Sequence, residues 1–291
     1  MSDIPKVTYF AKNPLTCPIC GHSVIKEELL SGSGRLIAGD LTDELHRKYE
    51  KTKKFGTIYP LTYVLPHCSS CHFTAFTPDW QNFKLKMSKQ LLMHEQKRAY
   101  EMAESILGPL NFDEPRRLEE GIASYLIALF VYEQAAPEMI PIFKQALVTL
   151  RGAWLASYLA QEDPEKEETS QQLSAMLYRK AAFYYRYSCE LEETTSQGFT
   201  KLSFQGPDQD NNFGFDGVLY LAGLLEFKYG QRNNPEARLI SLNSVKTIIS
   251  KIVGSGKASK SKPKDILDLA RSLYAAIKAE VESLEHELSK E

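Results

Sequence analysis

The sequence has no long hydrophobic run. Its longest apolar stretch, residues 121–131, is far shorter than the roughly 20 residues of a membrane-spanning helix. The first residues lack the basic stretch and following apolar run that mark a secretory signal peptide. We therefore expect a cytoplasmic protein with no membrane partner.

The common catalytic motifs are also missing. We find no nucleophile elbow, no phosphate loop, no His-Glu-x-x-His helix and no dinucleotide fingerprint. The glycine-rich stretch at residues 31–34 reads as a turn, because no Gly-Lys-Ser/Thr follows it. The sequence thus favours a protein that is not an enzyme, although residues scattered over the helical part can still assemble a site.

Net charge is small, −2 over 291 residues, but its distribution is uneven. Residues 1–100 hold 14 basic and 9 acidic side chains, whereas the remainder is acidic. The densest basic stretch runs from residue 47 to 54 and contains Arg47, Lys48, Lys51, Lys53 and Lys54. Such a cluster can contact nucleic-acid phosphates, or it can be an ordinary solvated face.

Cysteine is scarce, with five residues in all, yet four of them form two Cys-x-x-Cys pairs. In a reducing compartment such pairs favour metal binding over disulfides. We predict one structural zinc ion held by Cys17, Cys20, Cys68 and Cys71, because four thiolates fill a tetrahedral site and leave no open position. The 47 residues between the pairs add little closure cost. Iron is the rival metal, since rubredoxin-type knuckles share the Cys-Pro-x-Cys-Gly pattern.

Three histidines, His22, His67 and His72, stand beside these cysteines. Each can replace a cysteine as ligand and so open the site for metalloenzyme chemistry, or it can be a surface residue or a neighbour of the ligands. The fifth cysteine, Cys189, falls in the middle of a predicted long helix, where we interpret it as a small buried apolar residue.

The residue pattern changes once along the chain. Residues 1–82 read as a small zinc-ribbon-like module of strands, at 23–29, 35–38 and 58–65, with a short helix at 40–54. From residue 83 to 253 apolar residues recur with helical period, which predicts a tetratricopeptide-like solenoid or bundle. A flexible linker at 254–263 and a C-terminal helix at 264–291 follow. The predicted fold is therefore mainly α.

Several residue blocks together resemble a known family. The blocks contain the two Cys-x-x-Cys pairs, Arg35 and Asp40, residues 59–64, Ala75-Phe76, and residues 212–221. They resemble an uncharacterised bacterial domain-of-unknown-function family that joins a zinc-ribbon-like head to a tetratricopeptide-like tail. The resemblance covers most of residues 14–253 and implies a zinc site and a helical tail, but no activity. This chain has His72-Phe73 where the family tends to have Gly-Tyr, and Tyr59 where it tends to have Asn.

These observations favour a zinc-stabilised helical scaffold or adaptor that binds another, unidentified protein through its helical tail. The alternative is a zinc-ribbon nucleic-acid-binding protein that uses residues 47–54, and a metalloenzyme is the third interpretation. The sequence does not fix the partner, the pathway or the oligomeric state.

Overall fold

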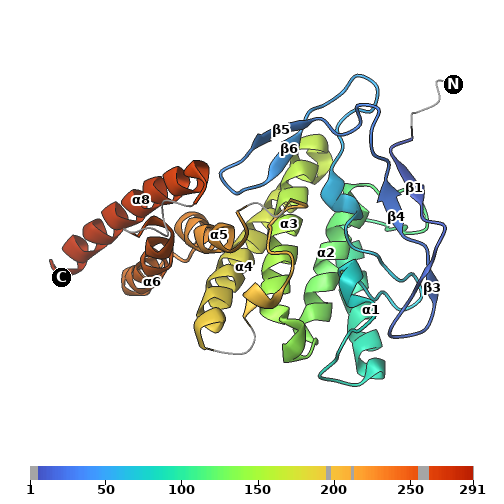
Figure 1. The fold of residues 1–291 in the computed structure, drawn as a ribbon. Helices are drawn as coiled ribbons and strands as arrows, with labels where there is room; N and C mark the ends of the chain where they lie inside the picture. Colours follow the sequence, from blue (N-terminus) through green and yellow to red (C-terminus); the bar gives the residue numbers. More distant parts are fainter. Residues whose placement is uncertain (1–5, 195–197, 211–212, 255–261, 291) are drawn as a thin grey trace. The chain divides into compact units, whose positions relative to one another are not determined.

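A computed structural model describes residues 6–194, 198–210, 213–254 and 262–290. The protein is mainly helical, with pairs of short antiparallel strands near its N-terminus (Figure 1). The α-helices of the described residues are α1 (Lys89–Leu107), α2 (Leu118–Glu133), α3 (Pro141–Glu162), α4 (Glu167–Thr194), α5 (Gly214–Tyr229), α6 (Pro235–Val253) and α8 (Lys264–Leu288). The predicted mainly α fold with a small β-rich N-terminal part is confirmed. The tetratricopeptide-like solenoid stays a prediction.

The chain divides into two compact units. Unit 1 comprises residues 1–42 and 47–174, and unit 2 comprises residues 43–46 and 175–291. Helix α4 therefore contributes to both units, and both cysteine pairs belong to unit 1. The linker predicted at 254–263 falls mostly on residues 255–261, which lie outside the described residues. The domain boundaries expected from the sequence stay predictions.

Three pairs of short strands precede the helices of unit 1. Strand β1 (Thr8–Phe10) pairs with β4 (Glu27–Leu29), and β2 (Leu15–Thr16) pairs with β3 (Ser23–Val24). The third pair joins β5 (Ala38–Leu41) to β6 (Arg47–Tyr49) with a bulge between Ala38 and Leu41. All three pairs are antiparallel, and the β2–β3 pair brackets the first cysteine pair.

The short helix predicted at 40–54 is wrong, because the chain forms the β5–β6 pair there. Its turn buries three successive residues, Glu44, Leu45 and His46. A helix points successive side chains about 100° apart, so it cannot bury three in a row against one neighbour. Leu45 instead takes a left-handed conformation with φ of 57° and is fully buried.

The strand predicted at 58–65 is also wrong. Residues Pro60–Tyr63 form a 3-10 helix with proline at its first turn, where the missing N–H removes no hydrogen bond. Leu61 and Leu65 are buried, so the apolar content that suggested a strand serves the core through a tighter turn. The segment predicted at 35–38 has no strand except Ala38, where β5 begins, and the strand predicted at 23–29 is split between β3 and β4.

Helix α2 is the central helix of unit 1. Nearly every residue from Glu119 to Tyr132 is buried, which is typical of a helix with neighbours on all sides. It lies between α1 and α3 (Figure 1). Gly121 permits the 3-10 helix at Pro60–Tyr63 to approach closely, since a Cβ at this position would lie 2.9 Å from Thr62 Cγ2.

A buried ion pair joins two further segments of unit 1. Lys144 on α3 donates from Nζ to Asp79 Oδ1 over 2.7 Å, and the Tyr132 hydroxyl donates to Asp79 Oδ2 over 2.6 Å. The Tyr132 oxygen also accepts the backbone N–H of Phe76 over 2.9 Å. The side chains of Lys144 and Asp79 are only 9% and 11% exposed, so the network is shielded from water.

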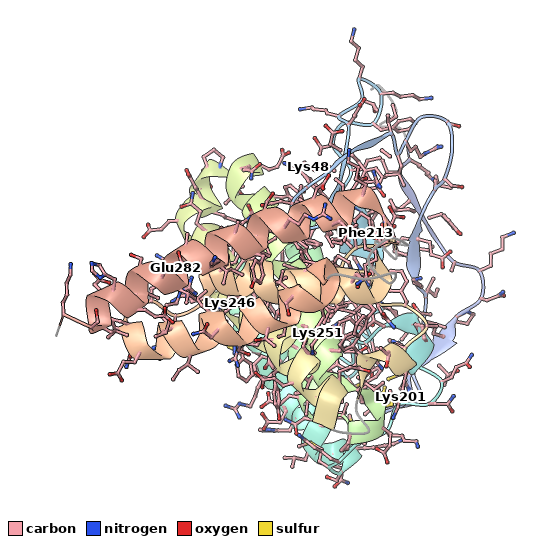
Figure 2. All side chains as sticks on the ribbon, turned by 60° about the vertical axis from the view of Figure 1, so that its left-hand side comes forward. Lys48, Lys201, Phe213, Lys246, Lys251 and Glu282 are labelled. Carbon is pink, nitrogen blue, oxygen red and sulfur yellow. The ribbon has the colours of Figure 1, made fainter. Side chains whose placement is uncertain are left out.

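In unit 2, helices α5, α6 and α8 pack on one another. Buried Arg238 on α6 ties this group together, donating to the backbone oxygens of Glu226 and Phe227 and, over 2.8 Å, to Glu280 Oε1 on α8. Charged side chains line the outer surfaces of α6 and α8, and Figure 2 shows Lys246 and Glu282 among them.

Gly223 on α5 marks the closest approach in this group. A Cβ there would lie 2.6 Å from both Ile249 Cγ1 and Cδ1 and 3.3 Å from Leu273 Cδ2. Gly223→Ala is therefore expected to destabilise unit 2 by about 1–3 kcal/mol through overpacking, measured by urea unfolding. Adding Ile249→Val, which removes the clashing methyl group, should recover part of the loss. A single Gly223→Ala variant of unchanged or greater stability would contradict the close approach.

Among the helices of the described residues, none is long and apolar enough to cross a membrane.

Candidate metal centre

The four paired cysteines converge in unit 1 to form one group, which we call the cysteine cluster. All four Sγ atoms of Cys17, Cys20, Cys68 and Cys71 lie within 4.8 Å of one another. The Cys17–Cys71 and Cys20–Cys68 sulfur pairs are both 3.6 Å apart. Four sulfurs at about 2.3 Å from a zinc ion in a tetrahedron would be about 3.8 Å apart. The cluster can therefore hold a metal ion with little movement.

The two halves of the cluster are built alike. The backbone N–H of Cys17 donates to the His22 oxygen over 2.8 Å, and that of Cys68 donates to the Phe73 oxygen over 2.9 Å. In each half the residue after the second cysteine donates its N–H back to the first cysteine's oxygen. That residue is Gly21, with φ of 78°, or His72, with φ of 61°. The repeated turn presents two sulfurs on one side of each loop.

Short strand pairings hold both turns in place. The first turn is closed by the β2–β3 pair, and the second by an isolated bridge between His67 and Thr74. Cys17, Cys68 and Cys71 are at most 3% exposed. These features are those of a closed structural site, in which four thiolates shield the ion from solvent.

The chemistry of the four cysteine sulfur atoms also favours a bound cation. All four cysteines are free thiols, because 3.6 Å is far beyond the length of a disulfide bond. Hydrogen bonds from the Cys68 and Cys71 thiols lower the pKa of Cys17 to about 4, whereas hydrogen bonds with Cys17 and Cys68 raise the pKa of Cys71. A bound divalent metal favours the thiolate form of a cysteine that coordinates it.

None of the three neighbouring histidines belongs to the ligand group found in the described residues. His22 is exposed. His67 is buried, contacts Thr74 Oγ1 through Nδ1 over 2.8 Å and stacks on Phe112 with ring centres 3.8 Å apart. Burial lowers the pKa of His67, so the ring is neutral. His72 stacks on Tyr100 of α1 with ring centres 4.1 Å apart.

These stacks fasten the second turn to the helices that follow it. Tyr100 lies on α1, and Phe112 lies between α1 and α2. Lys89 at the start of α1 donates to the Pro18 oxygen in the first turn over 2.7 Å. Both halves of the cluster thus contact α1 or the segment after it, which links the cluster to this edge of unit 1.

His72 occupies a position that glycine fits better, because its φ of 61° lies in the left-handed region. This is the position at which the family resemblance expects glycine. Removing the ring should destabilise unit 1 by loss of the stack on Tyr100. We expect His72→Gly to be more stable than His72→Ala by about 1 kcal/mol, since both lose the ring but only glycine relieves the backbone. Thermal melting of the metal-loaded variants measures the difference, and equal stability would contradict it.

The predicted nucleic-acid residues lie together on one exposed segment of unit 1. Arg47 and Lys48 belong to β6, and Lys51, Lys53 and Lys54 follow it. The Arg47 guanidinium donates to the Gly39 oxygen over 3.0 Å, whereas the four lysines are exposed. The structure therefore keeps these side chains close in space without testing whether they bind nucleic acid.

Arg35 and Asp40, singled out with the family resemblance, form no ion pair with each other in the described part of the chain. Arg35 Nε donates to the Lys6 oxygen over 3.1 Å, and its guanidinium lies 4.8 Å from the Phe55 ring centre. Cys189 on α4 is 3% exposed, and burial raises its pKa to about 12. It is an inert buried thiol, as the sequence predicted.

A groove and a cavity in the structure correspond to no motif in the sequence. Residues from α4, α5 and α6 of unit 2 line a groove of about 760 Å³. A smaller cavity in unit 1 lies at the start of α2 and contains Arg116, whose side chain is buried. A buried arginine is rare unless its charge is compensated, but burial cannot be seen in the sequence alone.

Comparison with known proteins gives one family and one relative. A family described as "Uncharacterized protein conserved in bacteria (DUF2225)" matches residues 10–277. An uncharacterized protein of Borreliella burgdorferi is 39% identical over 279 residues, which cover 96% of this chain and 99% of the relative. No solved structure matches the chain.

Proposed function

The chain belongs to the bacterial family described as uncharacterized conserved proteins (DUF2225), and we propose a function from the structure itself. The protein is a helical adaptor that contains one structural zinc ion and binds a segment of another protein. The observation that carries the proposal is the unit 2 groove, defined by the residues of α4, α5, α6 and the α5–α6 loop that line it.

Zinc is the metal we propose for the cysteine cluster. Four thiolates in a tetrahedron suit zinc or iron, and a closed cluster without an open position serves structure rather than catalysis. Zinc has no redox chemistry and fits a role in stabilising unit 1. Metal analysis of purified protein should give one zinc per chain, with the four cluster thiols unreactive until chelation. Iron in that analysis would overturn the choice of metal.

Part of the groove lining, which we call the floor, is apolar. Ala182 and Phe183 come from α4, and Tyr229 comes from the end of α5. Phe183 is 49% exposed although it is a large aromatic side chain. Met176, seven residues earlier on the same side of α4, is 40% exposed. An exposed apolar surface of this kind in a hollow is typical of a protein-binding site.

Positively charged side chains also line the groove, but most of them already pair with carboxylates. Arg186, Lys228 and Arg232 pair with carboxylates of unit 2, among them Glu190, Asp43 and Glu280. Arg179 donates only to the backbone oxygen of Ala175 and has no carboxylate partner among the described residues. The groove therefore suits a peptide segment with an apolar side chain for the floor and an acidic residue for Arg179.

Partner capture with substituted full-length protein tests this proposal. Phe183→Ser and Arg179→Glu change exposed groove residues and should leave the fold intact. Ile240→Ser is the matched control, because Ile240 is 72% exposed on α6 but does not line the groove. A partner retained by Ile240→Ser and lost by both groove variants supports the proposal. Equal retention by all three variants would refute it.

Nucleic-acid binding is the second candidate. Lys48, Lys51, Lys53 and Lys54 are exposed and have no carboxylate partner in the described part of the chain, and Phe55 lies beside Lys54 at 5.1 Å. Unpaired lysines beside an aromatic ring suit a phosphate backbone and a stacked base. Alanine at Lys51, Lys53 and Lys54 should weaken binding to single-stranded DNA or RNA and flatten its salt dependence. Unchanged affinity would exclude this candidate.

A further inference from the structure

A small cavity lies in unit 1 where the chain enters α2, and we call it the α2 cavity. Its volume is about 210 Å³, and its walls come from Val7, from residues 57–63 and from residues 116–118. Cavities for drug-sized molecules usually measure about 300–1,000 Å³. The α2 cavity therefore suits a small ion, or the ionic end of a larger molecule.

Arg116 is the cation of this cavity. Its side chain lines the wall, yet the residue is only 9% exposed. Nη1 donates to the backbone oxygens of Leu65, over 2.7 Å, and Thr62, over 3.3 Å. Nε is buried without a hydrogen-bond partner, and Nη2 has none among the described residues. Nη2 is therefore the guanidinium nitrogen that can donate to a ligand in the cavity, because Nε has no accessible surface.

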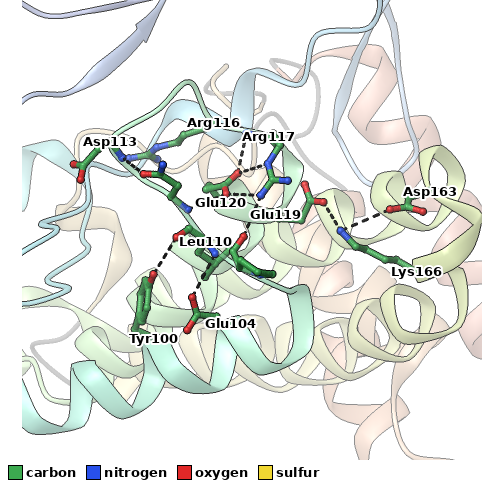
Figure 3. Close-up of polar contacts among 12 residues, drawn as sticks. Tyr100, Glu104, Leu110, Asp113, Arg116, Arg117, Glu119, Glu120, Asp163 and Lys166 are labelled. Carbon is green, nitrogen blue, oxygen red and sulfur yellow. Dashed lines mark hydrogen bonds and ion pairs between the residues drawn. The ribbon is translucent and has the colours of Figure 1, made fainter.

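Two carboxylates lie near Arg116, those of Glu27 and Glu120, and Glu27 Oε1 is buried without a hydrogen-bond partner. Glu27 accepts the backbone N–H of Arg116 over 3.0 Å through Oε2, and no carboxylate pairs with the Arg116 guanidinium within 4.0 Å in the described part of the chain. Glu120 binds the neighbouring Arg117 through both oxygens and also accepts the backbone N–H of Asn111 (Figure 3). Burial lowers the pKa of Arg116, while the nearby charges of Glu27 and Glu120 act in the opposite direction.

Two residues with hydroxyl groups also belong to the lining of the α2 cavity. Thr62 and Tyr63 both line the cavity, and Tyr63 makes only a long contact of 3.4 Å to the Arg116 oxygen. Tyr59 is unsuited as a donor, because its hydroxyl already donates to Glu162 over 2.6 Å. The first residue of α2, Leu118, also lines the cavity, and the start of a helix favours negative charge. The cavity lining thus includes hydrogen-bond donors from two segments of the chain, residues 62–63 and Arg116.

We propose that the α2 cavity binds a phosphate-sized tetrahedral oxyanion, either inorganic phosphate or the terminal phosphate of a small metabolite, with Arg116 as its principal contact. The ion would accept hydrogen bonds from Arg116 and from the hydroxyls of Thr62 and Tyr63, and it would compensate the buried charge. A water molecule can fill the space but supplies no charge, and a planar carboxylate matches fewer of the donors. This site lies in unit 1 and does not depend on the proposed partner groove.

Calorimetry and thermal melting of metal-loaded full-length protein test the site, with inorganic phosphate as the probe. Chloride at equal ionic strength controls for screening, and acetate tests a carboxylate. A phosphomonoester, glycerol phosphate, distinguishes the two sources of the phosphate group. Phosphate should bind saturably and raise the melting temperature, while chloride should not.

Substitutions decide whether the binding belongs to this cavity. Arg116→Lys keeps the charge but loses the fork, and it should weaken phosphate binding about tenfold or more. Because Arg116 also holds two backbone oxygens, Tyr63→Phe and Thr62→Val are the second test, each expected to weaken binding severalfold. Arg98→Gln on α1 is the matched control, since this exposed arginine pairs with Glu95 away from the cavity.

Three results would overturn the proposal. The first is no saturable response to phosphate or to glycerol phosphate beyond that of chloride. The second is tighter binding of acetate than of phosphate, which would identify a carboxylate site. The third is phosphate binding that survives unchanged in Tyr63→Phe and Thr62→Val, and in Arg116→Lys where that variant folds. Selective loss in the cavity variants with retention in Arg98→Gln supports the site.

Discussion

Replacing Cys68 by serine is expected to abolish stoichiometric metal binding and to unfold the N-terminal part of unit 1. Cys68 is fully buried, and its Sγ is 3.6 Å from that of Cys20. A serine hydroxyl is a poor zinc ligand, and structural zinc sites contribute on the order of 10 kcal/mol to folding. The short strand pairs around the cluster cannot replace a loss of that size. Metal content and the thermal melting curve measure the effect.

The fifth cysteine provides the control for this experiment. Cys189→Ser makes the same chemical change at a buried cysteine of unit 2 that lies outside the cluster. We expect this variant to keep one metal ion per chain and to lose at most the modest stability of a buried thiol. A Cys68→Ser variant with the metal content and melting temperature of Cys189→Ser would show that the cluster is not a structural metal site.

Replacing Asp79 by asparagine should have the second large effect. It leaves the Lys144 ammonium buried without its counter-ion, while the amide oxygen can still accept a hydrogen bond from Tyr132. Breaking a buried ion pair on one side typically costs about 3–5 kcal/mol. Urea unfolding at pH 7 should show a loss of this order. A loss below about 1 kcal/mol would mean that the pair is open to solvent.

The loss of stability caused by Asp79→Asn should shrink as the pH rises. Burial lowers the pKa of Lys144 in the native protein, and Asp79 partly offsets this effect. Without Asp79 the native pKa falls further below the unfolded value of about 10.4. The unfolded chain then binds more protons than the native one, so stability increases with pH up to that value. Unfolding midpoints at pH 7 and pH 10 measure this recovery, and a deficit that grows with pH would contradict it.

The double variant Asp79→Asn with Lys144→Met separates charge from packing. It removes the buried ammonium and should be more stable at pH 7 than Asp79→Asn alone, because no uncompensated charge remains. Its stability should also vary less between pH 7 and pH 10. If the double variant is no more stable than the single one, the cost of Asp79→Asn comes from lost hydrogen bonds rather than from charge.

Helix positions followed from local sequence signals where a glycine or proline marks the end or start of a helix. Gly108 ends α1, and Pro235 begins α6 with Asn234 as its N-cap. The predictions failed between residues 40 and 65, where apolar periodicity is short. There the turn around Leu45 and the 3-10 helix beginning at Pro60 replaced the expected helix and strand.

Distant partners explain the failure at the β5–β6 turn. Glu44 accepts hydrogen bonds from the hydroxyls of Tyr178 and Tyr229, which are 134 and 185 residues away, each over 2.9 Å. His46 pairs with Asp208, a further long-range contact within unit 2. The conformation of this turn is therefore set by residues that no local window includes.

The sequence by itself predicted that four cysteines come together, because two Cys-x-x-Cys pairs need only one turn each to present their sulfurs. It also determined the mainly helical fold, since helical periodicity and its glycine and proline limits are local properties. Only the tertiary structure decided the left-handed His72, the buried Arg116 at the α2 cavity and the groove of unit 2. The physical reason is that burial, cavities and unpaired donors arise where distant segments pack, and packing depends on all of them at once.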